Sequence, residues 1–243
     1  AAEDSTESAD TEDSSAEATK TEYPLTITTY DYDGNEIETT YEKAPEKVLA
    51  VYQGCIETLL ALGLEDHIVA TAGLDNEVPE DQKAAFSKTD YLDEFTPSLE
   101  TVTMLEPDMI FSWGSLFGDK TLGDAAGWVE KGTNTYINTN TRPGTGDVKY
   151  ARTLENEYTD ILNIGTIFDV QDKAEAIVND MKDTIAFGDS LNDLPMMQAA
   201  NIAVGMGNGT SLHPYVTFIT KDIKENGIYE AMKQLNLLSL SQI

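Results

Sequence analysis

Three residues with side chains suited to binding a small molecule follow predicted strands: Tyr52, Trp113 and Arg142. The two aromatic rings offer flat apolar contact for a large ring or a metal chelate. The guanidinium group of Arg142 could bind an anionic group of a ligand with several N–H donors, and basic residues are scarce, with 15 Lys and Arg against 44 Asp and Glu. The alternative is that Trp113 belongs to the core and Arg142 is a surface charge.

The positions of these residues depend on strands and helices that alternate along the chain. Apolar runs predict strands at 48–52, 68–72, 108–113 and 135–138. Helices are expected at 56–62, 97–105, 125–130 and 153–164, the last one ending near Gly165. Alternation of this kind is typical of a parallel sheet covered on both faces. Ligands of such sheets bind outside the carboxyl ends of the strands, which is where the three residues are expected.

The composition excludes several classes of function. A net charge of −29 and the lack of a basic patch argue against binding nucleic acid. Cys55 is the only cysteine, so neither an internal disulfide nor a cysteine-based zinc site can form. No stretch approaches the ~20 apolar residues of a membrane span. Residues 1–22 are acidic and polar, and we expect them to be disordered, either as a tether or as a tail without a role.

Two alternating β-rich runs, residues 25–30 and 36–41, surround the sequence Asp31-Tyr32-Asp33-Gly34. Such runs around Asp-Gly predict a β-hairpin. A strand of a parallel sheet, which is buried on both faces, would instead be continuously apolar, and Thr26, Thr28 and Thr29 interrupt the first run. The hairpin is therefore the preferred interpretation.

Residues 23–182 resemble the N-terminal lobe of class III solute-binding proteins, which deliver ferric siderophores, haem or cobalamin to ABC importers. The matching stretches, in order, are residues 44–48, 57–69, 99–102 and 105–110. The resemblance implies the substrate-binding component of an ABC importer, extracellular or periplasmic and not membrane-spanning, lipid-anchored through a removed N-terminal segment, with no required cofactor. It also implies that Glu100 docks onto the ABC permease, a solvated glutamate being the alternative.

The pattern changes after an amphipathic helix at 170–183. Residues 185–209 resemble the fourth motif of haloacid-dehalogenase (HAD) phosphatases of the sugar-phosphatase branch, and 218–228 continue that pattern. That resemblance implies a Mg²⁺ ion held by Asp189 and Asp193, and it makes Asp31 and Asp33 the candidate nucleophile and acid/base. No stretch supplies the phosphate-binding Ser or Thr and the Lys that the chemistry also needs.

The sequence therefore predicts an α/β protein. A parallel-sheet, Rossmann-like lobe with an N-terminal β-hairpin (23–169) follows the acidic tail (1–22). It is joined through a connecting helix (170–183) to a HAD-like β-α-β-β-α fragment (184–243). The preferred function is a truncated or chimeric binding protein rather than an enzyme. The alternatives are a magnesium-dependent phosphatase and a folded chimera without activity.

Overall fold

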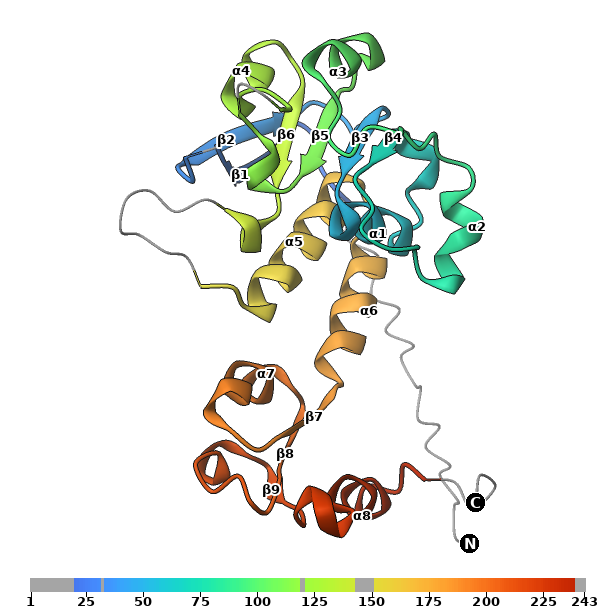
Figure 1. Ribbon diagram of the computed structural model, residues 1–243. Coiled ribbons are helices and arrows are strands. Elements are labelled where there is room, and N and C mark those ends of the chain that lie inside the picture. Colours follow the sequence, from blue (N-terminus) through green and yellow to red (C-terminus); the bar gives the residue numbers. More distant parts are fainter. Residues whose placement is uncertain (1–19, 32, 119–120, 143–150, 239–243) are drawn as a thin grey trace, which may run out of the picture.

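The computed structural model describes residues 20–31, 33–118, 121–142 and 151–238 (Figure 1). The strands are β1 (Leu25–Tyr30), β2 (Glu36–Tyr41), β3 (Val48–Val51), β4 (Ile68–Ala72), β5 (Met109–Ser112), β6 (Asn134–Ile137), β7 (Ile185–Gly188), β8 (Ile202–Gly205) and β9 (Phe218–Ile219). The α-helices are α1 (Gln53–Ala61), α2 (Lys83–Phe86), α3 (Leu99–Leu105), α4 (Ala125–Glu130), α5 (Leu154–Ile167), α6 (Gln171–Lys182), α7 (Leu194–Ala199) and α8 (Gly227–Gln234). Within these ranges no helix combines the length and the apolar character needed to cross a bilayer.

The main sheet has the order β4-β3-β5-β6, and every pairing in it is parallel. All residues of β3 and β5 are buried, as expected for central strands covered on both faces. β1 and β2 pair antiparallel with Leu25 opposite Tyr41. The parallel sheet and the N-terminal hairpin are thus confirmed.

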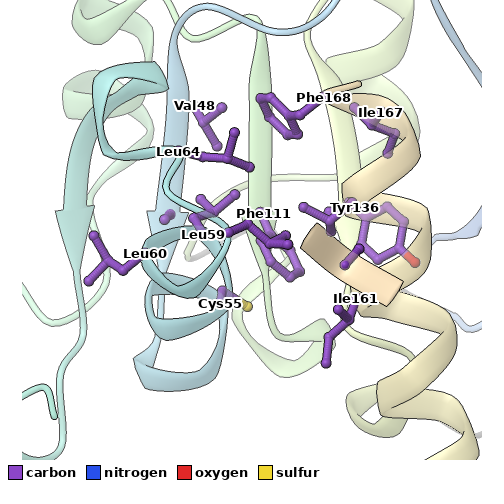
Figure 2. Close-up of a cluster of buried hydrophobic side chains, with 14 of the residues drawn as sticks. Val48, Cys55, Leu59, Leu60, Leu64, Phe111, Tyr136, Ile161, Ile167 and Phe168 are labelled. Atoms are coloured by element: carbon purple, nitrogen blue, oxygen red, sulfur yellow. The ribbon is translucent and has the colours of Figure 1, made fainter. Parts of the chain in front are cut away.

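Alternate side chains of the strands enter two separate hydrophobic clusters. Val48 and Phe111 pack with α1, α5 and α6 on one face of the sheet (Figure 2). Leu49 and Ile110 pack on the other face with Val102 of α3 and residues of α4. This alternation is the period-two geometry of a strand, and it places helices on both faces. The helices hold the strand ends in position without occupying the carboxyl edge.

α5 ends at Ile167, two residues beyond the expected end near Gly165. Glycine is frequent at helix ends, but here it lies inside the last turn. Here it allows α5 and α6 to approach closely, since a Cβ atom at this position would lie 2.4 Å from the Cβ of Ala174. Gly165 is therefore a packing residue.

We expect Gly165→Ala to lower the free energy of unfolding by about 1–2 kcal/mol, because overpacking costs more than the gain in helix propensity. Gly54 provides a matched control in α1, where an added Cβ meets no atom within 4 Å. Gly54→Ala should raise stability by up to about 1 kcal/mol. Urea unfolding measures both, and adding Ala174→Gly should restore the loss. Equal effects of the two alanines would contradict the close contact.

Residues 184–238 form a second, smaller body, here called the lower unit, and the described residues before it form the upper unit (Figure 1). The lower unit contains the parallel sheet β7-β8-β9 with α7 and α8, which confirms the β-α-β-β-α order. α6 leads directly into it, and Asn201 fastens the junction. The Asn201 backbone N–H donates to the Lys182 carbonyl (3.1 Å), and its side-chain amide donates to Asp183 Oδ1 (3.0 Å).

Candidate ligand-binding site

Tyr52 and Trp113 lie side by side at the carboxyl edge of the main sheet. They follow β3 and β5, which are paired in register with Val51 opposite Ser112. Their ring centroids are 3.8 Å apart and the planes are inclined by 38°. Both side chains are half-buried, so part of each ring stays open. Two residues predicted from different strands thus form one aromatic surface.

Phe95 adds a third ring that the sequence reasoning missed. Its centroid lies 6.0 Å from that of Tyr52 in an edge-on arrangement, and 47% of the residue is exposed. Phe95 lies in an irregular segment before α3, where no periodic pattern marks a side chain as inward or outward. The only available signal was its aromatic type in a polar loop.

The backbone of Tyr52 is in a sparsely populated conformation, with φ of 88°. Its N–H donates to the carbonyl of Ala72 (2.9 Å), and its hydroxyl donates to Asp75. That hydrogen bond raises the pKa of Tyr52. Gly73, with φ of 77°, makes the close approach possible, because a Cβ there would lie 2.8 Å from the carbonyl oxygen of Phe95. The loop after β4 therefore fixes the orientation of the Tyr52 ring.

A buried carboxylate organises the loop after β6. Asp160 of α5 accepts hydrogen bonds from the backbone N–H (2.7 Å) and the hydroxyl (2.6 Å) of Thr139, and from the hydroxyl of Tyr136 (2.8 Å). Burial raises the pKa of Asp160 to about 6, against the opposing effect of these hydrogen bonds. Thr141 in the same loop accepts from the N–H of Gly114 (2.9 Å), which ties the loop to the Trp113 segment.

Arg142 lies against the hairpin. Its guanidinium carbon is 4.1 Å from the ring centroid of Tyr30, the last residue of β1. This is a cation–π contact within the upper unit. The structure therefore places Arg142 beside Tyr30, and its role as a ligand contact stays a prediction.

A cavity of about 570 Å³ lies between the start of α5 and α7 of the lower unit. Its lining includes Asn140, Arg152, Leu154 and Met196. Asn140 connects it to the carboxyl edge of the sheet, since Asn140 donates to the carbonyl of Thr153 (2.9 Å). The volume of the cavity falls within the ~300–1,000 Å³ typical of small-molecule sites. Sequence reasoning missed Arg152, although the scarcity of basic residues could have drawn attention to it.

Glu100 is exposed in the first turn of α3, which is capped by Ser98. The Ser98 hydroxyl accepts from the N–H of Thr101 (3.2 Å). In Figure 1, α3 lies at the top of the upper unit, away from α7. This position leaves the Glu100 carboxylate open to a partner.

Asp189 and Asp193 lie together in the loop after β7. Asp193 Oδ2 accepts the backbone N–H groups of Asp189 (3.0 Å) and Ser190 (3.2 Å), so this carboxylate caps the next helical turn. In the described parts of the chain, no three His, Cys, Asp or Glu residues are grouped so that they could hold a metal. Mg²⁺ can be bound by one or two carboxylates together with water, so the Mg²⁺ ion at Asp189 and Asp193 stays a prediction.

Asp31 is part of the hairpin turn. Its two carboxylate oxygens accept from the backbone N–H (2.8 Å) and the side-chain amide (2.9 Å) of Asn35. The neighbouring Asp33 is exposed. The hairpin packs beside β6 in the upper unit, whereas Asp189 follows β7 in the lower unit (Figure 1). The structure does not bring the two aspartate pairs together.

Solved structures with a similar fold come from bacterial binding proteins. A periplasmic binding protein from Veillonella parvula DSM 2008 has a TM-score of 0.61 and 23% identity, and the alignment covers 80% of this chain and 77% of that one. A protein described as an ABC-type Fe3+-hydroxamate transport system, from Saccharomonospora viridis DSM 43017, has a TM-score of 0.53 and 15% identity, covering 88% and 99%. At these identities the likeness shows the fold alone.

A different relative matches a short part of the chain. "Putative phosphatase YkrA" of Bacillus subtilis (strain 168) is 45% identical over 65 residues, which are 26% of this chain. The chain spans only 25% of the length of that relative. This match is too partial to assign the chain to a phosphatase family.

The family model described as "Periplasmic binding protein" matches residues 48–192. The match includes both Tyr52 and Trp113, and it extends beyond the expected join at residue 184. Because it covers more than half of the sequence, the chain belongs to the periplasmic binding protein family.

Proposed function

We propose that this protein binds a ferric siderophore, haem or cobalamin-like molecule outside the cytoplasm and delivers it to an ABC permease. The observation that carries the proposal is the aromatic surface of Tyr52 and Trp113 at the carboxyl edge of a parallel sheet. Flat rings suit a large planar or chelated ligand. The similar protein from Saccharomonospora viridis, described as an ABC-type Fe3+-hydroxamate transport system, is consistent with the same class of cargo.

Arg152 and Arg142 are two cationic residues that lie near this edge. Arg152 lines the cavity against α7 together with Glu155 and Glu157, and its guanidinium group is the part of this lining that an anionic group of the ligand would contact. Arg142 contacts the ring of Tyr30, so it would have to move to join Arg152 at the ligand. The ligand is thus expected between the aromatic surface and the start of α5.

The partner and location follow from the same proposal. The exposed Glu100 on α3 would meet basic residues of the permease. A lipid anchor attached before the acidic segment 1–22 would keep the binding unit near the membrane. These roles rest on the family relationship and on the exposure of Glu100.

We further propose that the lower unit derives from a HAD-type phosphatase, which makes the chain a chimera. The relative named "Putative phosphatase YkrA", which is 45% identical over 65 residues, supports a phosphatase origin for a part of the chain. The separate placement of Asp31 and Asp189 argues against phosphatase activity. Hydrolysis of p-nitrophenyl phosphate with Mg²⁺ that is lost in Asp31→Asn would overturn that judgement.

Tryptophan fluorescence tests ligand binding directly, because the chain has only Trp113 and Trp128. Trp128 of α4 is 7% exposed, and its indole N–H donates to the carbonyl of Leu122. In Trp128→Phe, ferric hydroxamates, haem or cobalamin should quench the remaining Trp113 saturably. Quenching in Trp113→Phe should be much weaker.

A ferric chelate absorbs light and can lower the fluorescence of Trp113 without binding. Titration with the corresponding gallium chelate, which lacks the absorption of iron, is the control for this effect. A flat response of Trp113 to the whole ligand panel would leave a folded chimera without binding activity as the better description.

A further inference from the structure

A second cavity, of about 510 Å³, lies at the edge strand β4 beside the aromatic surface. Its apolar walls come from Leu74, Val78, Phe86 and Tyr91. The volume is in the range of small-molecule pockets. Neither the family relationship nor the proposed site accounts for it.

The walls are built from packed apolar side chains. Val78 is 5% exposed, and Leu74 and Phe86 pack against the main hydrophobic cluster. The rings of Phe86 and Tyr91 meet edge to face with centroids 5.9 Å apart. An occupant would therefore exchange water for direct contact with the core, which favours a hydrocarbon group.

The rim disfavours an anion. Lys83 bonds to Glu77 (3.0 Å) and Glu80 (2.8 Å), so one positive charge faces two negative ones. A carboxylate at this mouth would meet excess negative charge, and the chain as a whole carries −29. An uncharged chain fits the pocket better than a fatty acid does.

One short segment links this cavity to the aromatic surface. Asp75 accepts the hydroxyl of Tyr52, while its neighbours Leu74 and Asn76 line the cavity. The hydroxyl of Tyr91 also accepts the N–H of Leu74 (3.4 Å). A ligand resting on Tyr52 therefore needs to pass only this segment to reach the apolar walls.

We propose that the cavity binds an uncharged alkyl chain carried by the ligand of the aromatic site, an inference that rests on the proposed function. The cargo is then an amphiphilic chelate, with its head group on Tyr52 and Trp113 and its tail against Phe86 and Tyr91. Each buried methylene strengthens binding about fourfold.

The uncharged fluorescent probe N-phenyl-1-naphthylamine tests the pocket on the full chain without iron. We expect one saturable site, displaced by 1-octanol at least tenfold more effectively than by octanoate. Tyr91→Ala should weaken probe binding at least tenfold, and Tyr91→Phe should retain it. Tyr229→Ala in α8 is the matched control, since Tyr229 and Tyr91 are both 44% exposed. No binding, or a loss in Tyr91→Ala below tenfold, overturns the pocket.

Ferric hydroxamates with and without an octanoyl tail test the link between the two sites. The wild type should bind the tailed chelate at least tenfold more tightly than the chelate without a tail. Tyr91→Ala should bind the two chelates with equal affinity. Equal binding of both chelates by the wild type overturns this inference, although the proposed function survives. If the probe binds but neither chelate does, the proposed function is wrong. The inference that the cavity binds the alkyl chain of a chelate then fails with it.

Discussion

Ionisation of Asp160 should lower the free energy of unfolding of the wild type by about 2–3 kcal/mol between pH 4 and pH 7, and Asp160→Asn should remove this pH-dependent contribution. Burial raises the pKa of Asp160 from 3.8 in the unfolded chain to about 6 in the fold. A difference of about two units, at 1.36 kcal/mol each, gives this magnitude. Because the folded pKa is the higher one, the contribution to stability is fully present below about pH 3.8. It is lost as the pH rises through about 6.

Urea unfolding of the wild type and of Asp160→Asn at several pH values gives the free energy of unfolding as a function of pH. The contribution of Asp160 is the difference between the slopes of the two curves. Gly165→Ala is a suitable comparison, because it should lower the whole curve without changing its shape. If the curves of wild type and Asp160→Asn were parallel from pH 4 to 7, the pKa of Asp160 would be the same in the folded and unfolded chain. The predicted effect of burial on this carboxyl group would then be wrong. The amide should also loosen the 139–141 loop, since Asn cannot accept all three hydrogen bonds of the carboxylate.

Removing both aromatic rings, in Tyr52→Ala/Trp113→Ala, should weaken binding of the ferric or planar ligand by at least 100-fold. A buried aromatic contact typically contributes about 2 kcal/mol, or ~30-fold, when truncated. The ring centroids are only 3.8 Å apart, so each single variant also disturbs the other ring and the effects will not add. Trp113→Phe keeps a flat ring and should lose less than Trp113→Ala.

Isothermal titration with the ligand that quenches Trp113 is the appropriate measurement. Tyr215→Ala in the lower unit is the control, because Tyr215 is 51% exposed and remote from the aromatic surface. Circular dichroism must show that the double variant remains folded. Retention of wild-type affinity by a folded double variant would remove the aromatic surface from the binding site.

The aromatic surface could be predicted because its two residues follow strands whose apolar runs are unmistakable. Once β3 and β5 are parallel neighbours, Tyr52 and Trp113 must come together. Arg142 shows the limit of this reasoning. Its contact with Tyr30 depends on how the hairpin packs beside β6, and no local pattern encodes that distance.

Asp160 and Gly165 were also beyond sequence reasoning, for a related reason. Both lie inside α5, where an aspartate would ordinarily face solvent and a glycine would ordinarily end the helix. Their roles come from Thr139 and Ala174, which approach from other elements. A residue whose function is set by a partner distant in sequence is not recognised until the partner is placed.

The close crossing of α5 and α6 has a mechanical consequence. The chain passes between the two units once within the described residues, through α6, and Asn201 fastens the far end of this helix to the lower unit. From Ala174 at the crossing to Lys182 at that end, α6 is a lever arm of about 12 Å. Turning it by about 10° at the crossing would swing its tip by about 2 Å. Gly165 lies where this lever crosses α5, so a residue without a side chain sets how closely the two helices approach at the base of the lever.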